Sequence, residues 1–506
     1  MKIRSTALCA VIINTSAALS IFAVFAYVFA IALYLLYPNY LDHGQATVAS
    51  ISWLWMHGHE LYPNWTTGEI YGVIYGPVLF LINGMALLLS QSIFASKLPG
   101  VLSLGAALGA TWMLLRWKTA SSLTSLILLA SLIMLFAAFD EFVYWNRAEP
   151  FLILLSVLAL WLAFRSSSLV AGVGIGVLTG VATGLKIHGF IYTVPAVAAA
   201  LARIEVPRTR TVMAIIASAC AVAFAVLPYL EKGVSIIGYL RFLRVVGVDE
   251  GFLMYQFLDN VLFALILTAP IIVIWIVWKP ALNPSERWLL AALGASVVLI
   301  TVIGAKAGGG TFYLLPLAPI CIYAMAVVCA SSKIDVAKVA SCIFVSYLFA
   351  SLGLPLLPFW NPPNSPNIVR NIEHLYRLEA AAEQEKIAEL KTYLDSYPEA
   401  QIGVSDHEHY SSYFYRVFSV WNGRPLDVDF SIWMDLAYVG VDEGYILRFI
   451  KRCEIPVWIF PLGRPFTMIN WFNGLPLLSE NFRQTFFTNY RQIEAGQAYQ
   501  VWECKS

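Results

Sequence analysis

Charged side chains stand where long apolar runs of this sequence end. Asp42 follows the first apolar run, and three histidines and a glutamate come soon after it. A carboxylate in such a place can take a proton from a hydroxyl that comes within hydrogen-bond distance. An aspartate there can also cap the first turn of a following helix. Both roles stay open for Asp42, and they are compatible.

Two further pairs of polar side chains flank later apolar runs. Arg147 and Glu149 come directly before one run, and Lys186 and His188 come directly after the next. Cations at the outer ends of apolar helices can bind a phosphate or, with Glu149, sugar hydroxyls. The alternatives are an interfacial ion pair between Arg147 and Glu149, which would contribute little to stability, and a snorkelling lysine at position 186.

Lys306 is followed by three consecutive glycines after one alanine, in "KAGGG". Backbone N–H groups of successive glycines can form an anion-binding nest beside a cation, which makes Lys306 a candidate phosphate ligand. A flexible outer loop is the alternative. His57 and His59 point to opposite sides of any strand and are poorly aligned on a helix, so the sequence predicts no metal site there. No cofactor is expected, although a divalent cation stays open.

The composition indicates what kind of protein must position these residues. The chain has 506 residues, of which 59% are hydrophobic and only 12% charged. Soluble domains carry about 25% charged residues, so this composition is typical of a polytopic membrane protein. The net charge is +1 without a long basic run, which argues against nucleic-acid binding.

Eleven apolar runs are candidate transmembrane helices, because a bilayer core needs about 20 apolar residues per helix. They are 8–36, 98–115, 120–138, 150–164, 169–185, 189–202, 211–230, 257–278, 288–305, 312–330 and 339–358. A twelfth run, 72–90, is interrupted by glycine, proline and asparagine.

The placement of lysine and arginine decides the status of 72–90, because short cytoplasmic loops are enriched in these residues. If 72–90 does not cross and the N-terminus is inside, every inside loop holds at least one basic residue. We therefore expect 72–90 to be a juxtamembrane or re-entrant helix on the outer side and the C-terminus to be outside. The segment 46–58 is expected to be amphipathic and to lie along the membrane.

The sequence after the last apolar run reads as a separate soluble domain. Five prolines in 354–367 indicate a linker, so the domains are placed at 1–358 and 359–506. The domain is expected to be α/β, because helical and strand patterns alternate in it. The helices are predicted at 368–397 and 445–453, and the strands at 400–406, 434–441, 455–461 and 498–504. Cys453 and Cys504, the only cysteines of this domain, are predicted to pair in an oxidising compartment.

An ordered set of motifs resembles the GT-C glycosyltransferases that use polyprenyl-phosphate sugars, in particular the protein O-mannosyltransferase and lipid A aminoarabinose transferase-like enzymes. The motifs lie within 37–320 and are "YLDHGQ", "HELYPN", "YGPVLFL", "NRAEPFLILLSVLAL", "GLKIHGF" and "AGGGTFYLLPLAP". Two motifs depart from the family. Asp42-His43 stands where the family often has Asp-Glu, and Arg147-Ala148-Glu149 where it often has Arg-x-Asp.

The resemblance implies a fold of about eleven transmembrane helices with juxtamembrane helices in the first outer loop. It also implies an inverting glycosyltransferase, an integral protein of a bacterial cytoplasmic membrane with its active site and C-terminal domain on the periplasmic side. Such an enzyme would move a sugar from a polyprenyl phosphate to a hydroxyl of a glycan, lipid or protein. Its catalytic carboxylate would be Asp42. The expected substrate-binding residues are Arg147, Glu149, Lys186, His188, Lys306 and Tyr313.

Aromatic residues could cover the sugar of such a donor. Tyr313, Trp53, Trp55 and Trp65 are candidates for stacking, although most such residues form the aromatic belt at a membrane interface.

Two other functions stay open on the sequence. A transporter or flippase of lipid-linked glycans would place ionisable residues near the middle of its spans and would show inverted repeats. In this sequence the charges lie at the span ends, and no repeat is visible. A non-catalytic membrane assembly protein would bind through its outer domain and would not require the set of Asp42, Arg147, Lys186 and Lys306.

Overall fold

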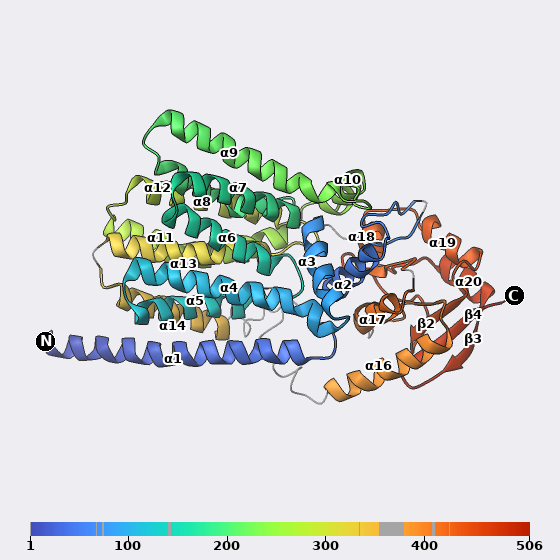
Figure 1. The fold of residues 1–506 in the computed structure, drawn as a ribbon. Coiled ribbons are helices and arrows are strands. Elements are labelled where there is room, and N and C mark those ends of the chain that lie inside the picture. The colour runs from blue at the N-terminus through green and yellow to red at the C-terminus, as the bar shows by residue number, and fades with distance from the viewer. Residues whose placement is uncertain are drawn as a thin grey trace. The chain divides into compact units, whose positions relative to one another are not determined.

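The protein is mostly helical (Figure 1). The computed structural model describes residues 2–66, 68–72, 75–139, 143–332, 334–353, 379–406, 410–424 and 426–505. The predicted linker 354–367 and the start of the predicted outer loop at 140–142 lie outside the described residues. The chain forms two compact units. The first comprises 1–35, 100–227 and 252–374, and the second comprises 36–99, 228–251 and 375–506.

The helices of the first unit coincide with the eleven predicted apolar runs. They are α1 (Lys2–Leu36), α4 (Ile93–Thr119), α5 (Ser122–Phe139), α6 (Glu149–Arg165), α7 (Ser168–Leu185), α8 (Val194–Ala202), α9 (Pro207–Val226), α11 (Met254–Trp278), α12 (Pro284–Ile303), α13 (Ala318–Ser331) and α14 (Val336–Gly353). Short 3₁₀ turns precede α8, follow α9 and precede α13, namely η2 (Gly189–Tyr192), η3 (Leu227–Leu230) and η5 (Thr311–Leu317).

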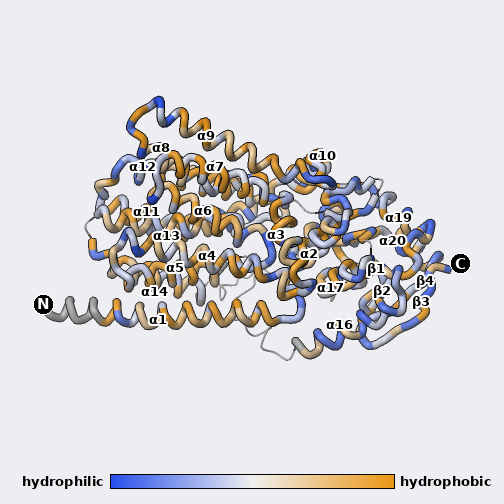
Figure 2. The backbone as a smooth tube through the Cα atoms, in the orientation of Figure 1, coloured by the Kyte–Doolittle hydropathy of each residue, from blue (hydrophilic) through white to orange (hydrophobic). Residues whose placement is uncertain are grey.

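Seven helical segments among the described residues are long and apolar enough to cross a membrane. Three shorter apolar helices lie at 77–89, 122–137 and 336–351. Figure 2 shows apolar residues along the helices of the first unit, whereas α16 (Glu379–Ser396) and the strands of the second unit carry more polar residues. Residues 312–329, which make up most of η5 and α13, are all buried, so they form the centre of the first unit.

A glycine seam joins α7 to α9. A Cβ atom at Gly176 would collide with the carbonyl oxygen of Ala217, and one at Gly180 with that of Ala221. Small residues at such spacing let two apolar helices approach closely where no hydrophobic effect drives them together. The rest of α9 is largely exposed, as expected for a helix surrounded by lipid.

The segment between α1 and α4 belongs to the second unit and contains α2 (His43–Met56) and α3 (Pro77–Leu89). At 13 residues, α3 spans about 20 Å. This is shorter than the ~30 Å core of a bilayer, and the prediction that 72–90 does not cross stays a prediction. The amphipathic character predicted for 46–58 is wrong, because α2 is buried on most sides against α3 and α17 (Tyr410–Trp421). Protein contacts therefore surround this helix.

The second unit also contains the predicted α/β region. Its strands are β1 (Ala400–Ile402), β2 (Val457–Pro461), β3 (Tyr490–Ala495) and β4 (Tyr499–Cys504). They form one sheet in the order β1-β2-β4-β3, with β1 parallel to β2 and the other pairs antiparallel. The remaining helices are α10 (Ile236–Arg244), the π-helical turn η4 (Val245–Asp249), α16, α17, α18 (Phe430–Tyr438), α19 (Gly444–Lys451) and α20 (Glu480–Asn489).

The strand predicted at 434–441 is wrong, because most of this segment belongs to α18. The helix begins after Asp429, whose side chain accepts a hydrogen bond from the backbone N–H of Ser431 at 2.8 Å. Such a cap satisfies an N–H that the helix leaves unpaired.

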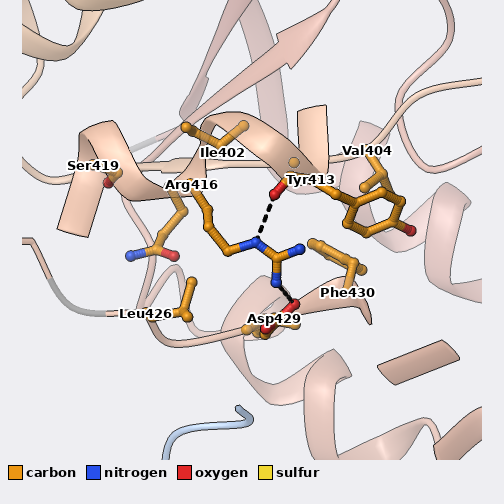
Figure 3. Close-up of a pocket in the computed structure, with 11 residues that line it drawn as sticks. Ile402, Val404, Tyr413, Arg416, Ser419, Leu426, Asp429 and Phe430 are labelled. Carbon is orange, nitrogen blue, oxygen red and sulfur yellow. Dashed lines mark hydrogen bonds and ion pairs between the residues drawn. The ribbon is translucent and has the colours of Figure 1, made fainter. Parts of the chain in front are cut away.

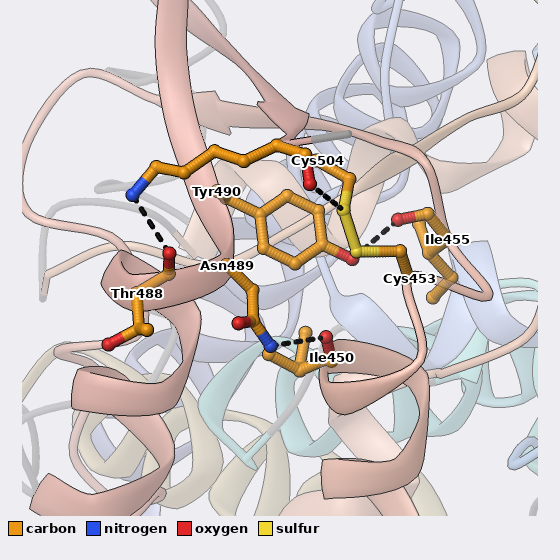
Figure 4. The surroundings of a disulfide bond; sticks show 8 residues. Ile450, Cys453, Ile455, Thr488, Asn489, Tyr490 and Cys504 are labelled. Atoms are coloured by element: carbon orange, nitrogen blue, oxygen red, sulfur yellow. Dashed lines mark hydrogen bonds between the residues drawn. A yellow bond between two sulfur atoms is a disulfide. The ribbon is translucent and has the colours of Figure 1, made fainter.

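Cys453 and Cys504 form a disulfide with their Cα atoms 6.0 Å apart, which confirms the predicted pair (Figure 4). The bond joins the turn after α19 to the end of β4. Next to it, the Tyr490 hydroxyl donates to the carbonyl oxygen of Ile455 at 2.6 Å, and the Asn489 side chain donates to that of Ile450 at 3.2 Å. The disulfide and these bonds fasten the end of β4 and the start of β3 to α19 and the residues that follow it.

Candidate functional site

Helix ends of the first unit bring five of the predicted site residues together. Arg147 and Glu149 stand at the start of α6, where a carboxylate in the first turn is favoured by the helix dipole. Lys186 ends α7, and its N–H donates to the carbonyl oxygen of Ala182. A Cβ atom at Gly189 would collide with that same carbonyl, so the turn that carries His188 back toward α7 requires a glycine.

Glu149 and Lys186 form a buried ion pair. Lys186 Nζ lies 2.5 Å from Glu149 Oε1, and their side chains are only 5% and 1% exposed. Arg147 Nε lies 3.8 Å from the other carboxylate oxygen, Glu149 Oε2. The carboxylate is therefore shared by two cations, and its closer partner is the lysine.

Two aromatic rings from η5 lie beside these cations. Lys186 Nζ is 4.4 Å from the centre of the Tyr313 ring and 5.4 Å from that of Phe312. The Arg147 guanidinium lies 5.4 Å from the Phe312 ring. The negative face of an aromatic ring attracts a cation, so the rings help to hold both side chains in place. Phe312 was missed on the sequence, although it adjoins the predicted Tyr313.

His188 completes this group. Its ring stacks on Tyr313 with 4.9 Å between ring centres and 21° between planes, and the Tyr192 hydroxyl donates to the Tyr313 carbonyl at 2.8 Å. Burial lowers the pKa of His188 well below its ordinary value, and the charges of Lys186 and Lys306 lower it further. The imidazole is therefore neutral at pH 7, and its buried Nε2 has no hydrogen-bond partner within the described part of the chain.

The glycine loop after Lys306 folds back on itself. Gly308 and Gly310 adopt positive φ angles of +66° and +154°, which favour glycine. The N–H of Gly309 donates to the Lys306 carbonyl at 2.9 Å, so this group is already used within the loop. Lys306 Nζ donates to the Ala307 carbonyl at 3.1 Å, and its charge acts on His188.

The group formed by Arg147, Glu149, Lys186, His188 and Tyr313, together with Lys306, is called the cation cluster below. The side chains of Arg147 and Lys186 meet at the carboxylate of Glu149, and the charge of Lys306 acts on the neutral His188. Several cations gathered in one place attract an anion.

Asp42 lies in the second unit and caps α2. Its Oδ2 accepts a hydrogen bond from the backbone N–H of Gly44 at 2.9 Å, and its Oδ1 lies 3.2 Å from His43 Nδ1. The capping role is therefore present in the structure. The side chain is 13% exposed, so the carboxylate keeps limited access to solvent.

The remaining outer-loop histidines have local partners. His57 Nδ1 lies 2.8 Å from the Trp53 carbonyl, and His59 Nδ1 lies 3.3 Å from Glu69. Within the described ranges, no three His, Cys, Asp or Glu side chains are arranged to hold a metal ion. Trp65 is buried against Phe242 and so does not belong to an exposed aromatic belt.

A second charged site, in the second unit, lines a small cavity (Figure 3). Arg416 pairs with Asp429 there, and it also donates to the Tyr413 carbonyl at 2.7 Å and to the Ser431 hydroxyl at 2.8 Å. The cavity of about 20 Å³ has room for roughly one water molecule. This pair therefore joins α17 to α18 and is too enclosed to bind a substrate.

Solved structures share the fold of the whole chain. No protein-family model and no curated protein matches the sequence. The crystal structure of ArnT from Cupriavidus metallidurans in the apo state matches with a TM-score of 0.55 and 12% identity, covering 96% of this chain and 98% of that chain. The same protein bound to undecaprenyl phosphate gives a TM-score of 0.56 and 12% identity, covering 95% and 97%.

ArnT is a lipid A aminoarabinose transferase with the GT-C fold, and its match extends over nearly all of both chains. A sequence identity of 12% establishes the fold alone. The resemblance of the sequence motifs to GT-C glycosyltransferases is therefore confirmed for the fold. The chain is an α-helical polytopic membrane protein with the GT-C fold and a small C-terminal α/β region.

Proposed function

We propose that this protein is a membrane glycosyltransferase that transfers a sugar from a polyprenyl-phosphate donor to an acceptor hydroxyl on the outer face of the membrane. The observation that carries the proposal is the gathering of Arg147, Lys186 and Lys306 with aromatic rings in the cation cluster, at helix ends of a GT-C fold. A lipid phosphate is the anion that suits this position, because its prenyl tail can stay in the bilayer while its head reaches the helix ends.

The cation cluster would bind the phosphate of the donor. Arg147 offers several N–H groups in a plane that matches phosphate oxygens, and Lys186 and Lys306 add point charges. The rings of Phe312 and Tyr313 keep water away from the cations, which strengthens their attraction to an anion. The neutral His188 can donate to or accept from a phosphate oxygen or a sugar hydroxyl.

Asp42 would act as the general base. It takes the proton of the acceptor hydroxyl while that oxygen forms a bond to the anomeric carbon of the sugar. The bond between this carbon and the phosphate oxygen breaks, and its electron pair leaves with the polyprenyl phosphate. Attack from the face opposite the phosphate inverts the anomeric configuration. The acceptor can be a glycan, a lipid or a protein, and no metal or cofactor takes part in this scheme.

Two observations support an active site on the periplasmic side of a bacterial cytoplasmic membrane. The lysine and arginine pattern places the first outer loop and the C-terminal region outside. The disulfide between Cys453 and Cys504 suits an oxidising compartment. A reporter that is active only in the cytoplasm, fused after Ser506, should stay silent, and a signal from it would contradict this orientation.

The central experiment measures transfer by the purified protein with a panel of polyprenyl-phosphate sugars. Asp42→Asn should keep the hydrogen bond to Gly44 and bind the donor normally, because the amide oxygen still accepts. It should lower turnover at saturating donor by about a hundredfold or more, because the basic oxygen is lost. Glu60→Gln, which removes another acid of the same outer loop, is the matched control. Wild-type turnover of Asp42→Asn would remove Asp42 from the mechanism.

Lys306 should act on binding instead. Lys306→Ala removes a cation that contacts the phosphate before and during the reaction, so donor affinity should fall by about tenfold while turnover at saturation changes little. Loss of turnover at full donor saturation would contradict a pure binding role.

A further inference from the structure

A row of aromatic rings begins beside Asp42 in the second unit. His43, whose Nδ1 contacts Asp42, lies 5.0 Å from the Trp471 ring, measured between ring centres. Trp471 lies 6.1 Å from Tyr413 and 5.8 Å from Phe472, and Phe472 lies 5.0 Å from Tyr438. These five rings, called the ring row, connect the capped start of α2 with α17, α18 and the turn 468–477.

A tight hairpin positions Trp471 and Phe472. Backbone bonds join Asn470 N–H to the Leu475 carbonyl at 2.7 Å and Leu477 N–H to the Met468 carbonyl at 2.9 Å. The buried Asn470 side chain anchors this hairpin, because it donates to the Met434 carbonyl and accepts from the N–H of Phe472, both at 2.9 Å. The rings are therefore held by a fixed backbone.

The ring row is partly open to solvent. His43, Trp471, Phe472 and Tyr438 are half-buried, whereas Tyr413 is buried beneath them. The same hairpin borders a cavity of about 560 Å³. Its polar lining includes Asn473, Glu443 and Glu480. This volume lies within the range of about 300–1,000 Å³ that is usual for small-molecule sites.

From this geometry we infer that the ring row and hairpin 468–477 bind the acceptor, and that the acceptor is a carbohydrate. The inference rests on the proposed function, in which Asp42 must meet the acceptor hydroxyl, so that side chains beside Asp42 contact the acceptor. A sugar ring presents a face of C–H groups, which suits the negative face of an aromatic ring. Its hydroxyls suit carboxylates and amides such as those in the cavity lining. The C-terminal region would then select the acceptor.

A peptide acceptor fits this surface less well. Extended peptides are commonly bound by adding a strand to an exposed sheet edge through main-chain hydrogen bonds. Around Trp471, hairpin 468–477 already uses the backbone groups of Asn470, Leu475 and Leu477 internally. This surface therefore presents the faces of aromatic rings to a ligand.

Ligand binding to the purified full chain tests the inference. The probes are three oligosaccharides, maltotetraose, chitotetraose and mannotetraose, together with an unstructured peptide rich in serine and threonine and, separately, undecaprenyl phosphate. At least one oligosaccharide should bind the wild type. Trp471→Ala should weaken that binding about tenfold, and Trp471→Phe should retain most of it because a ring remains. Undecaprenyl phosphate should bind both variants as it binds the wild type.

Trp421→Ala is the matched control, since it removes a half-buried tryptophan from the far end of α17. It should leave oligosaccharide binding unchanged. Equal binding by Trp471→Ala and the wild type, no binding of any oligosaccharide to the wild type, or Trp471-dependent binding of the peptide instead would each overturn the inference. Loss of undecaprenyl phosphate binding in the wild type would count against the proposed function, whereas the oligosaccharide result would still decide the role of the ring row.

Discussion

Two buried ion pairs, one in each unit, have different surroundings. In the second unit, Arg416 and Asp429 face each other one to one, and both make further hydrogen bonds to α17 and α18. In the first unit, Glu149 is paired closely with Lys186 and more distantly with Arg147. Glu149 Oε2 and Asp429 Oδ2 both lack a hydrogen-bond partner within the described residues, so this feature does not separate the two pairs.

The difference between these surroundings indicates which ion pair stabilises the fold and which one could bind a ligand. In the second unit one arginine faces one aspartate, and the cavity beside them has room for only about one water molecule. In the first unit one carboxylate is shared by Lys186 and Arg147, and Lys306 acts on the histidine beside them. Such a gathering of cations attracts an anion. Burial alone does not separate the two cases, since all four paired side chains are nearly inaccessible.

Breaking the balanced pair should have the largest effect. Asp429→Ala and Arg416→Met should each lower the free energy of unfolding of the second unit by about 3–5 kcal/mol, because each leaves an uncompensated buried charge. This loss is measured by urea unfolding of the full chain, monitored by tryptophan fluorescence. The double variant should recover part of the loss. If the single variants unfold like the wild type, the pair does not stabilise the second unit.

Removing the disulfide should come next. Cys453→Ser with Cys504→Ser opens a loop with a sequence separation of 51, and should cost about 2–4 kcal/mol of stability. Binding of undecaprenyl phosphate should be unaffected, because the disulfide belongs to the second unit and the cation cluster belongs to the first. Cys220→Ser, at a free cysteine, is the control. Equal unfolding midpoints with and without reductant would contradict the expectation.

The pH dependence of the second unit should reflect Asp427. Burial raises the pKa of this carboxyl to about 6. Glu69 and Glu454 also raise this pKa, whereas Arg448 and His59 lower it. Its folded pKa exceeds the unfolded value of about 3.9, so the contribution to stability is complete below about pH 4 and is lost as the pH rises through about 6. We expect a loss of about 1–2 kcal/mol between pH 5 and about pH 7.5, after allowance for partial exposure.

Asp427→Asn should abolish this loss, and the unfolding free energy at both pH values measures it. His59→Gln, at a neighbour of Asp427, is the control. A stability that rises with pH in the wild type would show that the sign is wrong.

The smallest predicted effect sharpens the comparison most, because the two partners should act in opposite directions. Lys186→Met should weaken undecaprenyl phosphate binding about tenfold, since a charged contact is lost. Glu149→Gln should keep or strengthen it, since the anion that competes with phosphate is removed. Equilibrium binding measures both. If both variants weaken binding equally, the Glu149–Lys186 pair is structural, like Arg416–Asp429.

Much of the fold could be predicted because the apolar runs are long. Each predicted run coincides with a helical segment, since a bilayer requires that length of apolar chain. The short elements of the soluble region were harder. An apolar stretch at 434–441 fits a strand or a helix, and the cap at Asp429, together with burial against its neighbours, made it a helix. Helices α17 and α20 and strand β3 were not predicted.

The candidate site could be predicted in part. The lysine and arginine pattern predicted that Arg147, Lys186 and Lys306 lie at the same depth, and in the structure Arg147 and Lys186 share the carboxylate of Glu149. The partner of Glu149 could not be foreseen, because Lys186 is 37 residues away and the contact depends on how α6 and α7 pack. The ring contact between His43 and Trp471 joins still more distant segments. Their catalytic and binding roles stay predictions.

The strand order also has a consequence for the synthesis of this protein. β4 lies between β2 and β3, although it is the last strand in the sequence. A chain that is synthesised from its N-terminal end can therefore pair β1 with β2, but β3 finds no neighbour until residues 499–504 have been synthesised. Until then two strand edges stay open to wrong partners. Arresting translation shortly before Tyr499 should leave the region sensitive to protease, and extending it past Cys504 should close the sheet and allow the disulfide to form.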